Sequence, residues 1–235
     1  MILYPRLITD TSFENSKIIS YGLIVYALDT GQTIIVQRLH SIGFLLILTG
    51  QYRPSIICLL VKDMTLDEVI ILESIIDNEN LFEEIFIKVG YLQKDLDYAY
   101  MRFMESKHII KNCLRKYNIP RLLEWTFPKG RLNVEYNEDP FICACREFTE
   151  EVEYELPEAI FVSDDYIVVE NIKTLDCKII ETRCWLYVVK NEFELTPLSN
   201  HSEVKDRKWV SLHQALKLMD KKSLIGPIES IISQI

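Results

Sequence analysis

The stretch that decides the fold is Asp139-Pro-Phe-Ile-Cys-Ala-Cys-Arg146-Glu147-Phe-Thr-Glu150-Glu151-Val152. Asp139 is a residue type that often caps a helix N-terminus, and proline suits the first helical position after it. Apolar residues recur at positions 141, 145, 148 and 152, which is the spacing of an amphipathic helix. The pattern therefore predicts a helix that begins after Asp139 and packs an apolar stripe against a core.

The acidic residues of this helix form a second pattern. Glu147, Glu150 and Glu151 are spaced i, i+3 and i+4, so they share one face. Their negative charges repel one another, and Arg146 relieves only part of that repulsion. The face is either a solvated acidic surface or a site for a hard divalent cation, because such cations prefer oxygen ligands.

The wider spacing, Glu138-x7-Arg146-Glu147-Phe-x-Glu150-Glu151, resembles the Nudix box G-x5-E-x7-R-E-U-x-E-E-x-G-U, where U is a bulky apolar residue. The resemblance implies an α/β fold, the Nudix α/β/α sandwich. It also implies that Glu147, Glu150 and Glu151 hold Mg²⁺ or Mn²⁺. Arg146 would orient these carboxylates, and Glu138 would support the loop before the helix.

Two positions depart from the box. Seven residues rather than five separate Gly130 from Glu138, which makes Glu135 a rival for the first glutamate. We prefer Glu138, because it keeps the spacing to Arg146. The second departure is Glu153, which stands where the family has glycine. Without that glycine we expect the helix to continue to about Leu156, before Pro157 stops it.

The segment Trp125-Thr-Phe-Pro-Lys129-Gly130 resembles the lead-in of the mRNA-decapping branch of the family. The chain is also similar to the decapping Nudix proteins of large DNA viruses such as African swine fever virus, in Ser20–Ile24, Ile35–Arg38 and Leu224–Pro227. Met64-Thr65 and the helical stretch after it occupy the place of the helical insertion in those proteins. This resemblance implies hydrolysis of capped mRNA with release of methylated GDP, in the host cell cytoplasm. Lys129 and Gly130 would then contact substrate phosphate.

Decapping enzymes carry a further glutamate six residues before a tryptophan, and Glu203 and Trp209 have that spacing. Glu203 is thus a candidate general base or additional metal ligand, with a surface carboxylate as the alternative. Two other functions stay open. One is hydrolysis of a diphosphoinositol polyphosphate or nucleotide diphosphate. The other is RNA binding by a catalytically weak protein that keeps the fold.

Three regions of the chain differ in pattern. Residues 18–61 are β-like, residues 63–122 have helical periodicity beginning with Asp63 as a possible cap, and strand patterns return after Trp125. Strands on both sides of helices indicate a mixed α/β sheet. We therefore expect a discontinuous Nudix domain (residues 1–62 and 123–235) interrupted by a helical insertion (residues 63–122).

The charge balance sets where RNA could bind. The net charge is −9, so any RNA must meet a local basic patch. The second half of the expected insertion is mainly basic, and Lys107, Lys111 and Arg115 line one helix face at i, i+4 and i+8. This face is a candidate RNA track, and a solvated helix face is the alternative.

The six cysteines include no Cys-x-x-Cys pair, so we expect free, mostly buried thiols in a reducing compartment. No secretory signal stands at the start of the sequence. The most apolar stretches are far shorter than the roughly 20 residues that a membrane-spanning helix needs. A cytoplasmic location without a membrane span is expected.

Overall fold

The computed structural model describes residues 17–116, 122–173, 179–199 and 204–235. These residues form two compact units. The helical unit contains residues 40–116 and 122–123, and the sheet unit contains the rest. None of the described helices combines the length and apolar character needed to cross a membrane.

The elements of the helical unit are all helices. They are α1 (Ile42–Leu48), α2 (Ile57–Lys62), α3 (Leu66–Asp77), α4 (Leu81–Lys88) and α5 (Leu96–Lys116), with 3₁₀ turns at Pro54–Ile56 and Gln93–Asp95.

The sheet unit contains eight described strands and three described α-helices. The strands are β1 (Lys17–Ala27), β2 (Gln32–Arg38), β3 (Trp125–Thr126), β4 (Lys129–Gly130), β5 (Phe161–Val162), β6 (Ile167–Lys173), β7 (Ile179–Val189) and β8 (Val204–Ser211). The helices are α6 (Pro140–Val152), α7 (Leu212–Leu218) and α8 (Ile225–Ile232), with 3₁₀ turns at Val134–Tyr136 and Lys222–Leu224.

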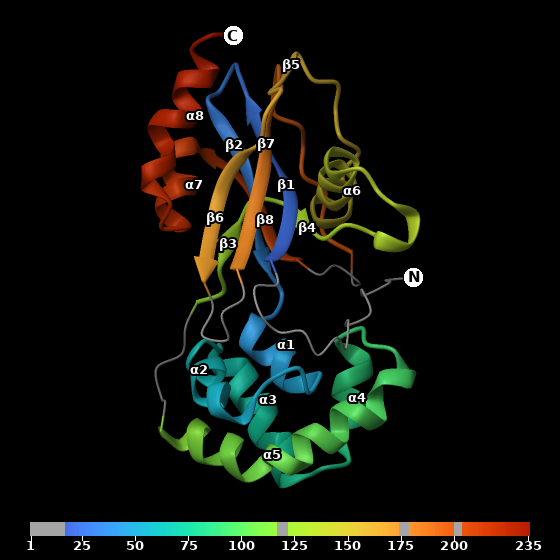
Figure 1. Ribbon diagram of the computed structural model, residues 1–235. Coiled ribbons are helices and arrows are strands. Elements are labelled where there is room, and N and C mark those ends of the chain that lie inside the picture. The colour runs from blue at the N-terminus through green and yellow to red at the C-terminus, as the bar shows by residue number, and fades with distance from the viewer. Residues whose placement is uncertain (1–16, 117–121, 174–178, 200–203) are drawn as a thin grey trace. The chain divides into compact units, whose positions relative to one another are not determined.

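The strands form one mixed sheet in the order β3-β2-β1-β7-β5, to which β4, β6 and β8 add beside β1, β7 and β2. β1 and β7 run parallel, and the other pairs are antiparallel. Helix α6 covers one face of the sheet, and α7 and α8 cover the other (Figure 1). This arrangement confirms the expected α/β class and the α/β/α layering.

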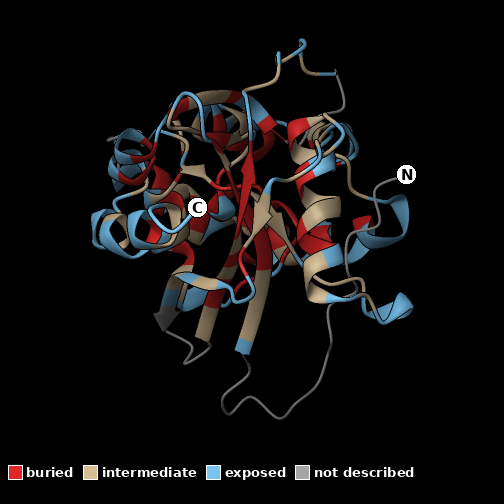
Figure 2. Cartoon of the chain, turned by 90° about the horizontal axis from the view of Figure 1, so that it is seen from above, coloured by how far each residue is buried: buried red, intermediate tan, exposed pale blue. Residues whose placement is uncertain are grey.

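Strand β1 supplies both cores, because successive side chains of a strand point to opposite faces. Leu23 and Val25 pack with Phe148 of α6, whereas Ile24 packs with Leu216 of α7. Buried residues accordingly concentrate in the sheet and on the inner sides of its helices (Figure 2). The same alternation decides which strand residues face the carboxylate helix.

Strands β2 and β3 lie side by side although a long stretch of chain separates them. Val36 pairs with Thr126 and Gln37 pairs with Trp125. Beyond them, the Arg38 amide donates a hydrogen bond to the Glu124 carbonyl over 3.4 Å. The chain therefore leaves the sheet and re-enters it at neighbouring points.

The expectation that residues 18–61 are β-like is wrong from residue 42 onward, where α1 and α2 lie. Ser41 caps α1, its hydroxyl accepting a hydrogen bond from the Phe44 amide at 3.1 Å. Phe44 and Ile47 are fully buried in the core of the helical unit. Tertiary packing thus outweighs the strand preference of the β-branched residues. The helical unit accordingly begins at residue 40, before the insertion boundary that the sequence predicts.

Helix α3 begins at Leu66 and its N-cap is Thr65, not the predicted cap Asp63. Thr65 and Glu68 form a capping box, in which the Glu68 carboxylate accepts a hydrogen bond from the Thr65 amide at 2.9 Å. The other carboxylate oxygen accepts one from the Ser41 amide at 2.6 Å. Glu68, only 3% exposed, thereby joins the starts of α1 and α3.

We expect Glu68→Ala to destabilise the protein by about 1–3 kcal/mol, because the buried Ser41 amide and the partly buried Thr65 amide lose their acceptor. Burial raises the pKa of Glu68, but hydrogen bonds from its neighbours outweigh burial and leave that pKa below its usual value. The stabilisation is therefore present above the unfolded-state pKa and lost as pH falls through the folded one. Denaturant unfolding between pH 3 and 7 measures this, with exposed Glu73→Ala in the same helix as control. An equal loss in both variants would contradict it.

The expectation of free thiols is wrong for one pair of cysteines. Cys58 of α2 and Cys113 of α5 form a disulfide with an S–S distance of 2.07 Å. They are 55 residues apart in the sequence, so spacing gave no sign that the two helices bring them together. Cys143, Cys145 and Cys184 are free.

Candidate active site

Helix α6 begins as predicted, with the Asp139 carboxylate accepting hydrogen bonds from the Phe141 and Ile142 amides at 2.8 and 3.2 Å. The side that packs on the sheet differs slightly from the predicted stripe. Phe148 and Val152 are buried as expected, but they are joined by Cys143 and Ala144, while Phe141 and Cys145 are only partly buried. The glutamates of the opposite side remain outside the core.

The predicted extension of α6 to Leu156 is wrong, because the helix ends at Val152. Glu153 adopts the left-handed conformation (φ 48°, ψ 44°) that usually favours glycine. Its carboxylate accepts hydrogen bonds from the amide and the hydroxyl of Ser199, both at 2.7 Å. These bonds offset part of the backbone strain. The helix therefore ends in a left-handed residue at position 153, although glutamate stands there instead of the family's glycine.

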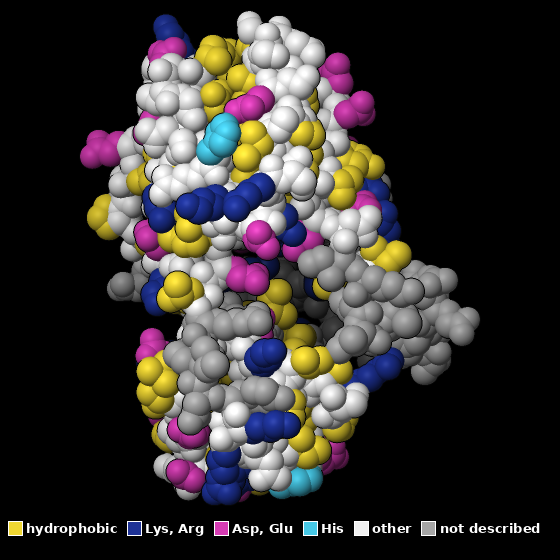
Figure 3. Space-filling model, turned by 90° about the vertical axis from the view of Figure 1, so that its left-hand side faces the viewer, with side chains coloured by type: hydrophobic (Ala, Val, Ile, Leu, Met, Phe, Trp, Pro, Cys, Tyr) yellow, Lys and Arg dark blue, Asp and Glu magenta, His cyan; other side chains and the backbone are white. Residues whose placement is uncertain are grey.

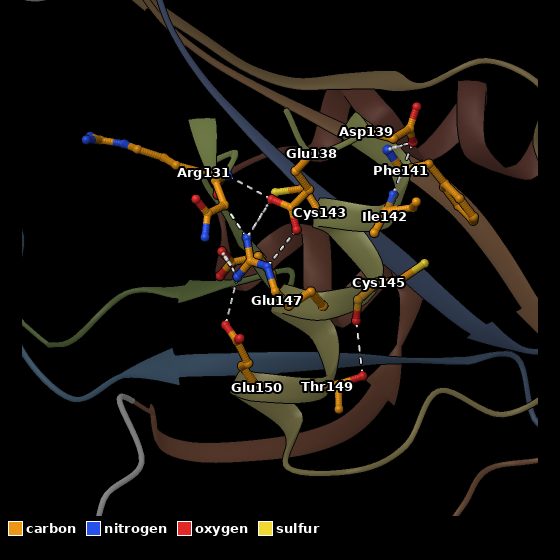
Figure 4. Close-up of polar contacts among 12 residues, drawn as sticks. Arg131, Glu138, Asp139, Phe141, Ile142, Cys143, Cys145, Glu147, Thr149 and Glu150 are labelled. Atoms are coloured by element: carbon orange, nitrogen blue, oxygen red, sulfur yellow. Dashed lines mark hydrogen bonds and ion pairs between the residues drawn. The ribbon is translucent and has the colours of Figure 1, made fainter. Parts of the chain in front are cut away.

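Glu138, not Glu135, contacts the box arginine. Arg146 donates from Nε and Nη2 to the two oxygens of Glu138 at 2.7 and 3.0 Å (Figure 4). Glu138 also accepts a hydrogen bond from the Asn133 amide at 2.8 Å, while Glu135 is exposed. The Arg146 hydrogen bond is the largest cause that lowers the pKa of Glu138, which keeps it ionised. Glu138 thus stabilises the loop before α6 through its hydrogen bonds with the Asn133 amide and the Arg146 side chain.

Arg146 also lies between two of the candidate metal ligands. Its Nη1 donates to Glu147 at 2.7 Å and to Glu150 at 2.9 Å. Its Nη2 additionally donates to the Arg131 carbonyl at 3.0 Å. The Glu138 hydrogen bond is the largest cause that raises the pKa of Arg146, so the guanidinium stays charged. Arg146 therefore offsets the mutual repulsion of the carboxylates.

Strand β4 meets α6 at the two other predicted site residues. The Glu147 carboxylate lies directly against Gly130, where a Cβ atom would overlap it. The neighbouring Lys129 amide donates a hydrogen bond to Glu151 at 2.9 Å. The backbone of the Lys129-Gly130 segment therefore contacts both Glu147 and Glu151. Only glycine fits at position 130, because any side chain there would overlap the Glu147 carboxylate.

Burial gives Glu151 and Lys129 unusual titration properties. It raises the pKa of Glu151 to about 8, although the Lys129 amide and the charge of Arg38 act in the opposite direction. Burial, helped by Arg38, lowers the pKa of the Lys129 ammonium. Arg38 is a site residue that sequence reasoning did not single out. The sequence feature that could have identified Arg38 is its position at the end of an apolar strand pattern.

The described residues hold no group of three His, Cys, Asp or Glu side chains arranged to bind a metal ion. In the structure, the positive charge between Glu147 and Glu150 is that of the Arg146 guanidinium. The donor chemistry nevertheless fits Mg²⁺ or Mn²⁺, because all three side chains offer carboxylate oxygens. Glu151 in particular is a buried carboxylate whose charged form a nearby cation would stabilise.

The remaining predicted site residues have other positions. Glu203 lies outside the described residues, so its role as general base or metal ligand stays a prediction. Trp209 lies in β8, and its indole donates a hydrogen bond to the Phe193 carbonyl at 3.1 Å. Lys107, Lys111 and Arg115 lie in α5 of the helical unit.

Comparison with protein families agrees with this site. The model of the NUDIX domain family matches residues 110–228, about half of the chain. The chain therefore belongs to the Nudix family. Glu138, Arg146 and the three α6 glutamates lie within the matched residues.

Solved structures similar to the chain share little sequence with it. A Caenorhabditis elegans Ap4A hydrolase is 16% identical, with a TM-score of 0.47 and coverage of 93% of this chain and 99% of that one. The Nudix domain of Shewanella oneidensis NrtR bound to ADP ribose is 11% identical, with a TM-score of 0.45 and coverage of 96% and 94%. A search of curated proteins found no significant match.

Proposed function

We propose that this Nudix protein is a metal-dependent hydrolase that cleaves the phosphoanhydride of the mRNA 5′ cap and releases methylated GDP, in the cytoplasm. The carboxylate arrangement on α6 carries the hydrolase part of the proposal, because Gly130 and the Lys129 amide hold Glu147 and Glu151 in place. The preference for a cap rests on the resemblance of the Trp125–Gly130 segment to decapping enzymes.

The site residues have separate proposed roles in metal binding, orientation and proton transfer. Glu147, Glu150 and Glu151 would hold Mg²⁺ or Mn²⁺, which when bound offsets phosphate charge and lowers the pKa of a water. Arg146 keeps Glu147 and Glu150 oriented, and Glu138 keeps Arg146 in place through two hydrogen bonds. Glu203 is the proposed general base, the Lys129 amide holds Glu151, and the positive charge of Arg38 favours an anionic substrate beside Glu151.

Hydrolysis of RNA labelled in its cap, with product identification in Mg²⁺ and in Mn²⁺, tests the proposal. We expect methylated GDP as the product. A diphosphoinositol polyphosphate and a nucleotide diphosphate serve as competing substrates in the same assay. Turnover of these alone would overturn the decapping proposal while leaving the hydrolase assignment intact.

The candidate RNA track in the helical unit is partly neutralised. Lys107 pairs with Glu79 at 2.5 Å, and Lys111 lies 3.7 Å from Asp77 of α3. Lys111 and Arg115 also line a groove together with the acidic residues Glu73 and Asp77. On the face that Figure 3 shows, the Lys and Arg side chains of this unit are scattered rather than joined in one continuous patch. This pairing favours the second candidate function, hydrolysis of a small nucleotide or diphosphoinositol substrate.

A charge-neutralising variant separates the two candidates. If α5 binds RNA, changing Lys107, Lys111 and Arg115 together to glutamine should weaken binding of capped RNA. It should also reduce the salt dependence of binding by about 0.7 per lost contact. Hydrolysis of a free cap dinucleotide should not change.

The matched control replaces three exposed lysines of the same unit, Lys62, Lys88 and Lys94, by glutamine, which removes equal charge. Equal weakening of RNA binding in both variants would mean that only overall charge matters. If neither triple variant bound RNA more weakly than the wild type, hydrolysis of a small substrate would be the favoured function.

A further inference from the structure

A row of paired residues crosses the sheet beneath α6. Tyr21 of β1 pairs with Gly130 of β4 on one side and with Arg183 of β7 on the other, and Arg183 pairs with Val168 of β6. Paired residues in register point to the same face, so these side chains lie on the face that α6 covers. Neighbouring strands are about 4.8 Å apart, which places Arg183 about 10 Å from Gly130.

Four aromatic side chains gather beside Arg183. Trp185, two residues further along β7, has its ring centroid 6.2 Å from Tyr21, 5.6 Å from Phe141 and 5.8 Å from Tyr166. Trp185 is partly buried, whereas Tyr166 is 39% exposed. The Arg183 guanidinium lies 4.5 Å from the centre of the Tyr166 ring. Tyr21 is only 6% exposed, so Tyr166 and the partly exposed Arg183 and Trp185 form the accessible aromatic and cationic surface at the far end of the row.

This surface is held in place by buried polar groups. The Ser163 hydroxyl donates to the Asp165 carbonyl at 2.8 Å and accepts from the Leu186 amide at 3.0 Å, which fixes the turn before Tyr166. Arg183 Nε donates to Glu181 at 2.6 Å, and Glu181 also pairs with Lys17 at 2.8 Å. Among the described residues, none accepts a hydrogen bond from the terminal amino groups of Arg183. The Arg183 side chain is 21% exposed, so its terminal amino groups are accessible from solvent.

We propose that Tyr166, Arg183 and Trp185 form the nucleobase-binding surface of this enzyme, while the phosphoanhydride lies over Gly130 and the carboxylates. This inference rests on the proposed hydrolase function and names its substrate class, a nucleotide. An extended nucleoside diphosphate has about the length of the row. The surface offers a tyrosine ring and a guanidinium plane for stacking, and guanidinium donors for the edge of the base.

The charge balance favours a base over a second phosphate group. Glu181 pairs with both Lys17 and Arg183, so this cluster of three charged residues retains a single positive charge beside the Tyr166 ring. A polyphosphorylated inositol would need several cations at this distance from the carboxylates. A base needs stacking surface and a few donors, which is what the residues present.

Binding measured without turnover tests the inference. Calorimetry would follow GDP, methylated GDP and pyrophosphate with Tyr166→Ala, and Tyr166→Phe is the matched control that keeps the ring. Loss of one stacking residue should weaken binding of GDP or its methylated form about 5- to 100-fold. Pyrophosphate, which has no base, should bind equally to all three proteins, and thermal melting checks the fold.

Kinetics separates this inference from the proposed cap specificity. With whichever nucleotide the wild-type protein hydrolyses, Tyr166→Ala and Arg183→Lys should raise KM and change kcat less than about threefold. A preferred nucleotide other than the cap would overturn decapping but leave the surface in place. Unchanged nucleotide affinity in Tyr166→Ala, or an equal loss for pyrophosphate, would overturn the surface itself.

Discussion

Glu150→Gln should lower the turnover of any phosphoanhydride substrate by about 10²–10³-fold or more, because electrostatic stabilisation of the transition state is lost with the carboxylate. The fold should persist. Glu150 is 58% exposed and pairs with Arg146 on the surface, and exposed ion pairs contribute little to stability. Losing one of three neighbouring negative charges also relieves repulsion in the absence of metal. Turnover and thermal melting, measured together at saturating Mg²⁺, check both parts.

Glu135→Gln is the matched control for this experiment. Glu135 is the rival that the loop insertion creates, yet it is exposed and has no contact with Arg146 among the described hydrogen bonds. We expect its turnover to stay within about twofold of the wild type. If Glu135→Gln were as inactive as Glu150→Gln, the assignment of Glu138 to the box would have to be reversed. Near-normal turnover of Glu150→Gln would remove Glu150 from the metal site.

Gly130→Ala should inactivate the enzyme almost as strongly through a single methyl group. That methyl would overlap the Glu147 carboxylate and force it away from Glu151 and Arg146. A displaced catalytic group can cost about 10²-fold in rate. Metal affinity should fall in parallel, which titration with Mn²⁺ would detect without a substrate.

Gly226→Ala is the control, because it makes the same substitution where a new Cβ meets nothing within 4 Å beyond its chain neighbours. Gly226 lies in the first turn of α8, within the α7/α8 side of the sheet unit, so alanine there should leave turnover unchanged. Full activity of Gly130→Ala would show that Glu147 can move without consequence.

The parts of the structure that the sequence predicts well depend on local spacing. The start of α6 at Asp139 and the mixed α/β class follow from short-range patterns, and the choice of Glu138 over Glu135 follows from its spacing to Arg146. The α/β/α layering is implied by the resemblance to the Nudix family. Glu153 is instructive, since its residue type disfavours the left-handed conformation that it adopts. Its contacts with Ser199 come from a distant segment, so the sequence gave no indication of them.

The predictions that failed depend on packing between distant residues. The apolar residues of α1 and α2 suit strands and helices alike, and only the core around Phe44 decides for helices. The Cys58–Cys113 bond requires α2 to lie on α5, which no spacing reveals. Likewise, the lysines of α5 form one face in the sequence, but their acidic partners belong to neighbouring segments of the helical unit.

The pairing of β2 with β3 has a consequence for protein engineering. These strands are the two arms of an antiparallel hairpin, and the whole helical unit takes the position of its turn. The hydrogen bond between Arg38 and Glu124 closes the base of that turn. A tight two-residue loop could therefore bridge the gap, since hairpins of that kind join adjacent antiparallel strands. Such a minimal protein would keep every α6 residue of the carboxylate site and would report what the enzyme does without its insert.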